Sequence, residues 1–457
     1  MLRARTIWLL AACCVLACAS PASLSSDDAH DATVEYDVDW RSSWADVQSD
    51  SADVTTPPNA CEYRLQQEGA ELADCDAWEC GDNVLANCLS LPVLRLWIAD
   101  DQWDKLMDDV KADVEVDGLF YFMGRCGEVG VEIHGGLARK FAKKSLKVKF
   151  NRGAWFPDDP FIEGPDPDVA GKGYKQFVLK AHWVDPSLMR DHLTHDVTRA
   201  LGGLAPRVTH VNLILNGSYH GIYALTESIL QDFFIRMGLE GEGNLYKAVS
   251  HYANFKDKGN ALEGYEKKMN VYDDSDDLAL LLKQIAAAPL DFESFESSVG
   301  QSLDIDLYLA YSVANAFTNN QDAFTKNYYL YHELEESEGP FLTVNWDADA
   351  TFGISWDGTE EEADTGGLWG KLNSLSAKLQ KIPEYRAANA KIHADGLAGP
   401  LSPTTLHASI DAITSTIAPD IRFEECRWEK EGSFADHLEV IHAFVDERAA
   451  IVEDWLD

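Results

Sequence analysis

The sequence predicts an α+β protein with two lobes, a strand-rich N-terminal half followed by a helix-rich C-terminal half. Short runs that alternate apolar and polar residues recur between residues 92 and 226, and mostly helical patterns follow Glu227. No internal repeat is visible. The chain has 457 residues, 46% of them hydrophobic, which is enough for a sizeable core. This length corresponds to two or three domains or to one large domain with insertions.

The net charge of the chain excludes one class of partner. The sequence holds 38 Lys and Arg residues against 77 Asp and Glu residues, a formal charge of −39. A nucleic-acid surface needs clustered Lys and Arg, and so does electrostatic docking on anionic lipid. We therefore expect no nucleic-acid partner. A local exception is the basic stretch at residues 139–149, which is a candidate site for nucleotide phosphate or an acidic partner.

Residues 1–18 predict a secretory signal peptide, because a basic start is followed by an apolar run too short to span a bilayer. Its end, Val-Leu-Ala-Cys at residues 15–18, resembles a bacterial lipobox in which Cys18 would be acylated, and ordinary cleavage nearby is the alternative. Residues 19–58 hold nine acidic residues against Arg41 and predict a solvated tether. We expect an exported cell-envelope protein that meets the membrane only through a lipid anchor.

Six cysteines remain after Cys13, Cys14 and Cys18, namely Cys61, Cys75, Cys80, Cys88, Cys126 and Cys426. An even number in an exported chain predicts disulfides, and four of them predict a stapled cap over residues 59–90. A zinc site is the alternative, but the spacings are not CxxC pairs and no nearby His completes a set. The spacing leaves the disulfide pairing open.

The pattern of each segment predicts the elements of the strand-rich half. Strands are expected at residues 92–98, 130–136, 145–150, 176–181, 208–215 and 221–226. The last two are joined by the hairpin signal Asn216-Gly217. A helix is expected at residues 101–110, and a second at residues 186–201, with Pro in its first turn and Gly202-Gly203 at its end. A turn-rich insertion occupies residues 157–168.

The strongest chemical signal lies in the helix-rich half. An apolar helix at residues 303–317 leads to Asp322, and Asn327 starts a strand five positions later. The next strand, near residues 341–345, runs into Asp347 and Asp349. In phosphoryl transfer one Asp can orient the attacking hydroxyl, while an Asn and a second Asp bind magnesium. Turn capping is the commonest use of single Asp and Asn residues, but the order of these features favours a site.

These segments together resemble the CotH family of kinase-like proteins, atypical kinases typified by a spore-coat protein. The segments that carry the resemblance are residues 141–150, 185–191, 211–227, 243–247, 322–331 and 345–349. The resemblance implies an atypical protein-kinase-like fold over residues 91–457 that uses ATP and Mg²⁺ (or Mn²⁺) and phosphorylates a protein hydroxyl. It implies that Asp322 is catalytic and that Asn327 and Asp347 bind metal, with Asp349 as a further ligand.

The residue that would bind the nucleotide phosphates stays open. The order of strands favours Lys180, while the lysine-rich strand offers Lys143, Lys147 and Lys149. Arg190 is a candidate for contacting phosphate or ordering the lysine strand, and Glu227 marks the hinge that follows the strands.

The helix at residues 186–201 carries no Glu to pair with a lysine, and its acids are Asp191 and Asp196. This departure motivates a second hypothesis, a kinase-fold envelope protein with a binding or structural role and little or no transfer activity. A secreted hydrolase is a third class, but no G-x-S-x-G motif supports it.

Overall fold

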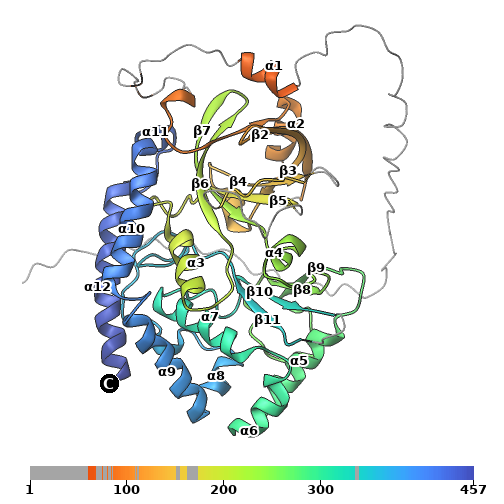
Figure 1. Ribbon diagram of the computed structural model, residues 1–457, viewed down its shortest axis with the longest axis vertical. Helices are drawn as coiled ribbons and strands as arrows, with labels where there is room; N and C mark the ends of the chain where they lie inside the picture. The colour runs from red at the N-terminus through yellow and green to blue at the C-terminus, as the bar shows by residue number, and fades with distance from the viewer. Residues whose placement is uncertain are drawn as a thin grey trace, which may run out of the picture. The chain divides into compact units, whose positions relative to one another are not determined.

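Seven strands of the N-terminal half close into a barrel in the computed structural model (Figure 1). They are β1 (Val93–Trp97), β2 (Glu115–Phe122), β3 (Arg125–His134), β4 (Ser145–Phe150), β5 (Gln176–Lys180), β6 (Val208–Leu215) and β7 (Ser218–Glu227). Their order around the barrel is β1-β2-β3-β4-β5-β7-β6, with antiparallel neighbours throughout except the parallel pair of β1 and β6 that closes it. Because the barrel is closed, none of these strands leaves a free edge.

The structure describes residues 60–67, 75, 80, 84, 86–108, 110, 113–150, 155–161, 173–334 and 339–457. The predicted signal peptide and acidic tether, residues 1–58, therefore lie outside the described residues. Much of the predicted Cys-rich cap also lies outside the described residues, and so do residues 162–168 of the predicted insertion.

The alternation of side chains along β4 and β5 determines what faces the barrel interior. Leu146 and Val148 of β4 are fully buried in the barrel core, while Lys147 lies on the outer face. On β5, Leu179 points inward, and the alternation puts Lys180 on the outer face. The outer face of β5 is where the barrel meets the second half of the chain.

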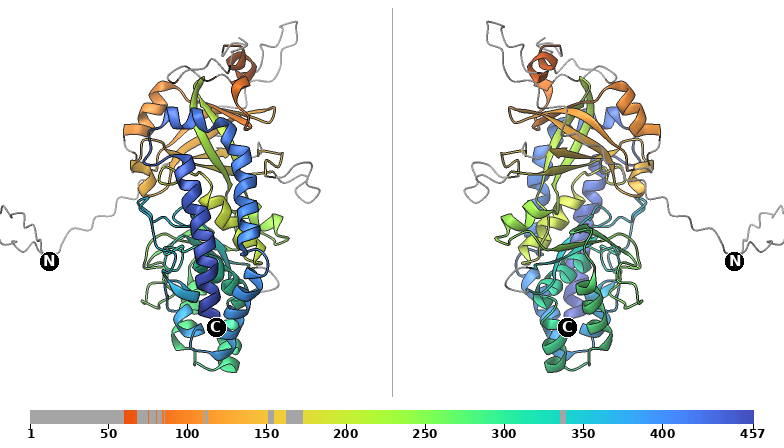
Figure 2. Two further views of the ribbon diagram at one scale, coloured as in Figure 1. Left: turned by 90° about the vertical axis from the view of Figure 1, so that its left-hand side faces the viewer. Right: turned by 90° about the vertical axis from the view of Figure 1, so that its right-hand side faces the viewer.

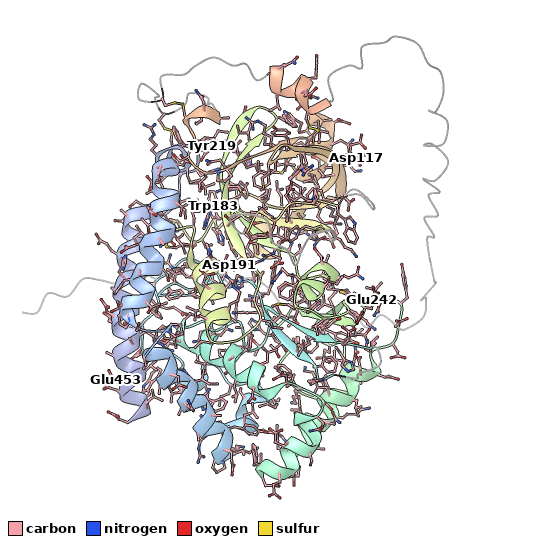
Figure 3. All side chains as sticks on the ribbon, in the orientation of Figure 1. Asp117, Trp183, Asp191, Tyr219, Glu242 and Glu453 are labelled. Carbon is pink, nitrogen blue, oxygen red and sulfur yellow. A yellow bond between two sulfur atoms is a disulfide. The ribbon has the colours of Figure 1, made fainter. Side chains whose placement is uncertain are left out.

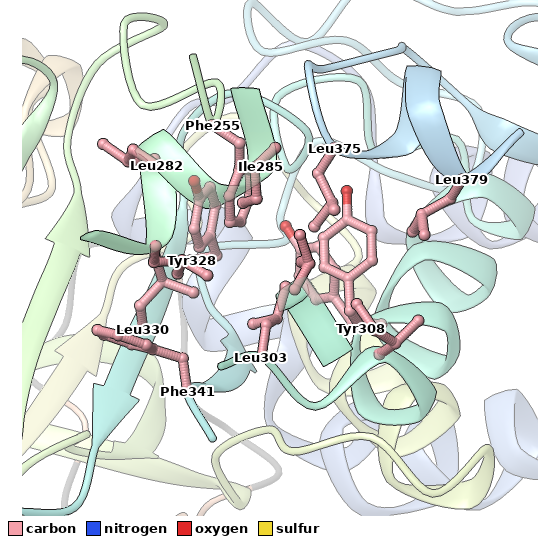
Figure 4. Close-up of a cluster of buried hydrophobic side chains, with 14 of the residues drawn as sticks. Phe255, Leu282, Ile285, Leu303, Tyr308, Tyr328, Leu330, Phe341, Leu375 and Leu379 are labelled. Atoms are coloured by element: carbon pink, nitrogen blue, oxygen red, sulfur yellow. The ribbon is translucent and has the colours of Figure 1, made fainter. Parts of the chain in front are cut away.

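The C-terminal half contains a four-stranded antiparallel sheet in the order β11-β10-β8-β9. Its strands are β8 (Asn244–Ala248), β9 (Tyr265–Met269), β10 (Tyr328–His332) and β11 (Leu342–Asn345). Helices α5 (Asp276–Ala287) and α7 (Ile305–Phe317) contribute to one core with this sheet, in which Tyr308, Tyr328 and Leu330 are fully buried (Figure 4). The apolar helix predicted at residues 303–317 is thus present as α7.

Helices make up the rest of this half. The longer ones are α9 (Pro383–Leu397), α10 (Pro403–Ile417) and α12 (Phe434–Leu456), and the shorter ones are α4 (Gln231–Arg236), α6 (Phe292–Phe295) and α8 (Ser376–Leu379). Helices α10 and α12 lie side by side and extend to the level of the barrel (Figure 2). No helix in the described part of the chain is long and apolar enough to cross a membrane. The strand-rich half followed by a helix-rich half confirms the predicted α+β, two-lobed fold class.

The second predicted helix begins later than expected. Helix α3 spans Arg190–Ala200, and residues 185–189 form turns instead. The carboxylate of Asp185 accepts hydrogen bonds from the backbone N–H groups of Ser187 and Arg190, at 3.1 and 3.0 Å, and Leu188 has a positive φ of 60°. These side-chain to backbone bonds favour a turn over a helix, so the helix starts at Arg190. Figure 3 shows Asp191 at this start, between the barrel and the helices.

Helix α11 (Ile421–Arg427) joins the far end of the chain to the barrel. Just before it, the carboxylate of Asp420 accepts hydrogen bonds from the backbone N–H of Leu91, at 2.8 Å, and from the side chain of Asn212 in β6, at 2.6 Å. The carboxylate of Glu424 accepts a hydrogen bond of 2.8 Å from the backbone N–H of Ile222 in β7. Both carboxylates are buried.

The six predicted cysteines form three disulfides, Cys61–Cys126, Cys75–Cys88 and Cys80–Cys426, which confirms the disulfide prediction. One pair therefore lies within the Cys-rich segment, while the other two connect that segment to β3 and to α11. Helix α1 (Ala60–Gln67), which carries Cys61, and α2 (Asp100–Asp108) are the first helices of the described chain.

Candidate functional site

Lys180 and Asp191 form a buried ion pair where the barrel meets α3. Lys180 is the last residue of β5, and Asp191 lies in the first turn of α3. The Nζ atom of Lys180 is 2.8 Å from Oδ1 of Asp191 and 3.1 Å from Oδ1 of Asp347. The side chains of Lys180 and Asp191 are 5% and 0% exposed, whereas that of Asp347 is 43% exposed. Two carboxylates therefore hold one lysine, and of these Asp347 is the one that solvent reaches.

The attraction among these charges exceeds the cost of burying them. Burial lowers the pKa of Lys180, but Asp191, Asp347 and Asp349 together raise it above its ordinary value. Burial raises the pKa of Asp191, but Lys180 and His195 lower it well below its usual range. The ammonium and the carboxylate consequently both stay charged at neutral pH.

Asp191 also connects α3 to the turn that follows β11. Its Oδ1 atom accepts a hydrogen bond of 2.7 Å from the backbone N–H of Ala348, between the two candidate metal ligands Asp347 and Asp349. The acidic partner that the sequence analysis sought as a Glu is therefore an Asp. Asp191 was not recognised as the partner because its contact with Lys180 depends on where α3 begins. The turns at residues 185–189 place the first residue of α3 at Arg190.

The pairing of β10 with β11 brings Asn327 next to Asp347. Tyr328 lies opposite Asn345 in the antiparallel ladder, so the residue before β10 meets the residues after β11. The side-chain Nδ2 of Asn327 donates a hydrogen bond of 3.3 Å to the backbone carbonyl of Asp347. Both residues adopt the left-handed backbone conformation, with φ of 61° and 59°. This conformation is uncommon outside glycine and recurs at functional sites, and Asn and Asp adopt it more readily than most residues.

The oxygen atoms at this point fit a hard divalent cation. The donors would be the side-chain oxygen of Asn327 and the carboxylates of Asp347 and Asp349. Burial and the neighbouring Asp347 raise the pKa of Asp349 to about 7, because two carboxylates close together resist ionising at once. Magnesium is commonly held by one or two carboxylates, with phosphate oxygens and waters completing its shell. The set therefore suits a cation that arrives with a nucleotide.

The described side chains give less support to a metal ion that is bound by protein ligands alone. The described residues contain no group of three or more His, Cys, Asp or Glu side chains placed to hold a metal ion. A metal at Asn327, Asp347 and Asp349 would thus depend on further ligands from its substrate.

Asp322 lies in the loop between α7 and β10, and two neighbours hold its carboxylate. The Nζ atom of Lys326 is 2.8 Å from Oδ2 of Asp322, and Nε2 of His251 is 3.9 Å from Oδ1. The backbone carbonyl of Asp322 accepts the N–H groups of Thr325 and Lys326, which forms a tight turn. The side chain is 20% exposed, so an incoming hydroxyl group can reach it.

Trp346 forms an aromatic floor beneath the lysine. It is buried, and Nζ of Lys180 lies 4.7 Å from the centroid of its ring. The ring of His134, at the end of β3, meets the Trp346 ring edge-on at 6.0 Å. This indole face favours a cation above it and thereby adds to the forces that position Lys180.

The other candidates from the sequence bind elsewhere. Lys143 is fully buried, and its Nζ lies 2.7 Å from Glu424 of α11. Lys147 is paired with Glu132 on the outer face of the barrel. Arg190 is fully buried and paired with Asp185 at 2.5 Å. These three side chains are therefore paired with carboxylates other than Asp191, Asp347 and Asp349.

Glu227 is likewise engaged. It ends β7, is 1% exposed, and receives two hydrogen bonds of 2.7 Å from the guanidinium group of Arg236. Its carboxylate fixes the connection from the barrel to α4. Of the sequence candidates, Lys180, Asn327 and Asp349 thus each interact with Asp347 or its backbone, and Asp322 lies in the loop just before Asn327.

Comparison with known proteins gives a family match and two related sequences. The family model described as "CotH kinase protein" matches residues 131–452. The inner spore coat protein H of Bacillus subtilis (strain 168) is 26% identical over 380 residues, which cover 81% of this chain and 99% of that protein. The invasin CotH7 of Rhizopus delemar is 22% identical over 275 residues, which cover 54% of this chain and 45% of that protein.

The solved structures that match this chain include two bacterial proteins. One is HipA of the Shewanella oneidensis MR-1 toxin–antitoxin system, in a complex with HipB and operator DNA, with 11% identity and a TM-score of 0.33. That match covers 90% of this chain and 76% of the other. The second is the Helicobacter pylori proinflammatory kinase CtkA, with 13% identity and a TM-score of 0.27, which covers 62% and 89% of the two chains.

Proposed function

Because the chain belongs to the CotH kinase protein family, we propose that it is a metal-dependent kinase that transfers the γ-phosphoryl group of ATP to a hydroxyl group of a protein. The observation that carries the proposal is the contact of Lys180 with both Asp191 and Asp347, beside Asn327. In protein kinases a lysine paired with an acid of a helix lies beside an Asp that holds magnesium, and Lys180, Asp191 and Asp347 would supply these three parts.

Each residue has a defined role in this proposal. Lys180 binds phosphate oxygens of ATP, and Asp191 holds the ammonium group in position. Asn327, Asp347 and Asp349 hold the divalent cation, which when bound neutralises charge on the phosphate oxygens. Asp322 accepts the proton of the acceptor hydroxyl as its oxygen attacks the γ-phosphorus, the bond to the β-phosphate oxygen breaks, and ADP leaves. Lys326 orients the carboxylate of Asp322.

The test separates metal binding from phosphoryl transfer. Purified protein is assayed for Mg²⁺-dependent ATP binding and for transfer of label from [γ-³²P]ATP to a generic protein acceptor, with Mn²⁺ as the alternative metal. Asp347→Ala is expected to abolish metal-dependent binding. Asp322→Ala is expected to retain binding and lose transfer. Asp395→Ala, at an exposed position of α9, is the matched control and should behave as wild type.

Two results would contradict the proposal. Metal-dependent nucleotide binding that survives Asp347→Ala would remove the site assignment. Equal background labelling by wild type and Asp322→Ala would favour the alternative, a kinase-fold envelope protein with a binding or structural role.

We also propose that the protein is exported and anchored by lipid at Cys18. The three disulfides support export, because disulfides persist in oxidising compartments. Metabolic labelling with a palmitate analogue should mark the wild-type chain and not Cys18→Ser. Labelling of both chains would exclude acylation at this residue.

A further inference from the structure

Lys247 is a second lysine at the site, and neither the predicted roles nor the proposed mechanism uses it. It lies on β8, directly opposite Tyr329 of β10. Leu245, two residues earlier on the same face of β8, packs in a cluster with Val178 of the barrel strand β5. Tyr246, on the opposite face, packs with the helices of the C-terminal half. Lys247 therefore projects from the sheet face that is directed toward the barrel and Lys180.

The ammonium group of Lys247 shares its aromatic surface with Lys180. Its Nζ atom lies 5.6 Å from the centroid of the Trp346 ring and 5.7 Å from that of Tyr329, while Nζ of Lys180 lies 4.7 Å from the same Trp346 ring. Both lysines are thus held around one indole. Asp347, which adjoins Trp346, exerts the largest attraction of any charged group on Lys247.

The two lysines differ in how their charge is balanced. Lys180 has carboxylate oxygens at 2.8 and 3.1 Å. Among the residues that the structure describes, no carboxylate comes within 4.0 Å of the Lys247 ammonium, and no side-chain hydrogen bond from it is formed. Aromatic faces compensate a partly buried cation only in part. The charge of Lys247 is accordingly available for an anion that enters the site.

We infer that Lys247 binds a phosphate group of the nucleotide beyond the one held by Lys180, and so selects nucleoside triphosphates over monophosphates. This inference rests on the proposed function, because it takes ATP as the ligand. An ammonium group offers three hydrogen-bond donors and no acceptor, which suits the oxygens of a terminal phosphate. A nucleoside monophosphate carries a single phosphate group, so once Lys180 binds that group no second phosphate remains for Lys247.

The experiment measures equilibrium binding of ATP, ADP and AMP with Mg²⁺ to wild type, Lys247→Met and Lys247→Arg. Methionine keeps the apolar packing on Trp346 and Tyr329 but removes the charge, and arginine keeps the charge. Lys391→Ala, on the surface of α9, is the control for a change of one unit in the net charge. Thermal melts of all variants establish that they are folded.

Lys247→Met is expected to weaken ATP binding about tenfold or more and AMP binding less than about twofold, because a charge-assisted hydrogen bond is lost with ATP alone. Lys247→Arg should restore most of the ATP affinity, and Lys391→Ala should bind like wild type. If Lys247→Met leaves ATP affinity unchanged, or weakens ATP and AMP by the same factor, Lys247 only packs against the aromatic rings and the inference fails. If wild type binds none of the three nucleotides, the proposed function fails and the inference fails with it.

Discussion

Replacing Asp191 with asparagine removes one of the two charges that hold Lys180. The substitution keeps the size of the side chain and an oxygen that can accept the N–H of Ala348, which now lies 2.7 Å from Asp191. Lys180 keeps its contact with Asp347 at 3.1 Å, so its ammonium group is not left without a partner. The loss is that of one charge-assisted hydrogen bond, and we expect the free energy of unfolding to fall by roughly 1.5–3 kcal/mol.

Asp191→Ala should cost more, because Ala348 then loses its acceptor as well. A buried N–H without a partner adds roughly 1–3 kcal/mol, which brings the total near the roughly 3–5 kcal/mol typical of a broken buried ion pair. The assay is urea unfolding at pH 7 followed by tryptophan fluorescence. A double-mutant cycle with Lys180→Met isolates the coupling between the two side chains, which should exceed about 1 kcal/mol.

Asp196→Asn is the matched control on the same helix. Asp196 is 39% exposed and paired with Arg199, and exposed ion pairs contribute roughly 0–1 kcal/mol. Nucleotide affinity provides a second measurement, since Asp191→Asn frees Lys180 to move and should weaken ATP binding. The reasoning is refuted if Asp191→Asn and Asp196→Asn destabilise the protein equally, or if Asp191→Asn binds ATP as tightly as wild type does.

Two further predictions concern stability. Burial lowers the pKa of His182 to about 4 and the pKa values of His192 and His210 to about 3. These histidines therefore stay neutral in the folded protein, whereas in the unfolded chain they bind protons below the ordinary histidine pKa of 6.5. The stability that the neutral histidines confer is complete above about pH 6.5 and is lost as the pH falls toward 3, by up to about 1.4 kcal/mol per histidine and pH unit. The urea midpoint should therefore fall steadily from pH 7 to pH 5.5 and pH 4.5. A constant midpoint would show that these histidines do not cause the pH dependence. The Cys80–Cys426 disulfide joins residues 346 positions apart, and its removal by Cys80→Ser with Cys426→Ser should cost roughly 2–5 kcal/mol of stability. This cost should exceed that of removing Cys75–Cys88, whose residues are 13 positions apart. Urea unfolding of both double variants gives the ranking, and the reverse ranking would rule out loop closure as the cause of the stabilisation.

Local patterns predicted those elements whose side chains have two distinct environments. Strand β4 alternates because Leu146 and Val148 face the barrel core while Lys147 faces outward, and the segment predicted as a strand has the bounds that the structure gives it. Strand β8 went unpredicted, because it packs on both faces and its residues therefore show no period of two. Strand β2, in which Gly118 interrupts the apolar pattern, was missed as well.

Long-range pairings were beyond the reach of local patterns. The Asp-x4-Asn spacing and the later Asp347 marked one region of the site, since all three lie within one short stretch of chain. The sequence could not exclude Lys143 as a phosphate ligand, because its partner Glu424 lies 281 positions away. The pairing of Cys80 with Cys426 was open for the same reason. Which carboxylate each lysine meets is a property of the folded chain.

Helix α11 has a mechanical consequence for the site. The barrel already meets the helix-rich half through α3, where Asp191 holds the turn after β11. Through Asp420 and Glu424, α11 attaches the same barrel a second time, and Cys426 bonds it to the Cys-rich segment. Its neighbours α10 and α12 belong to the core that contains α3 and α7. The barrel and the helix-rich half are therefore joined by buried hydrogen bonds at both α3 and α11, and any change in their relative position has to accommodate both sets.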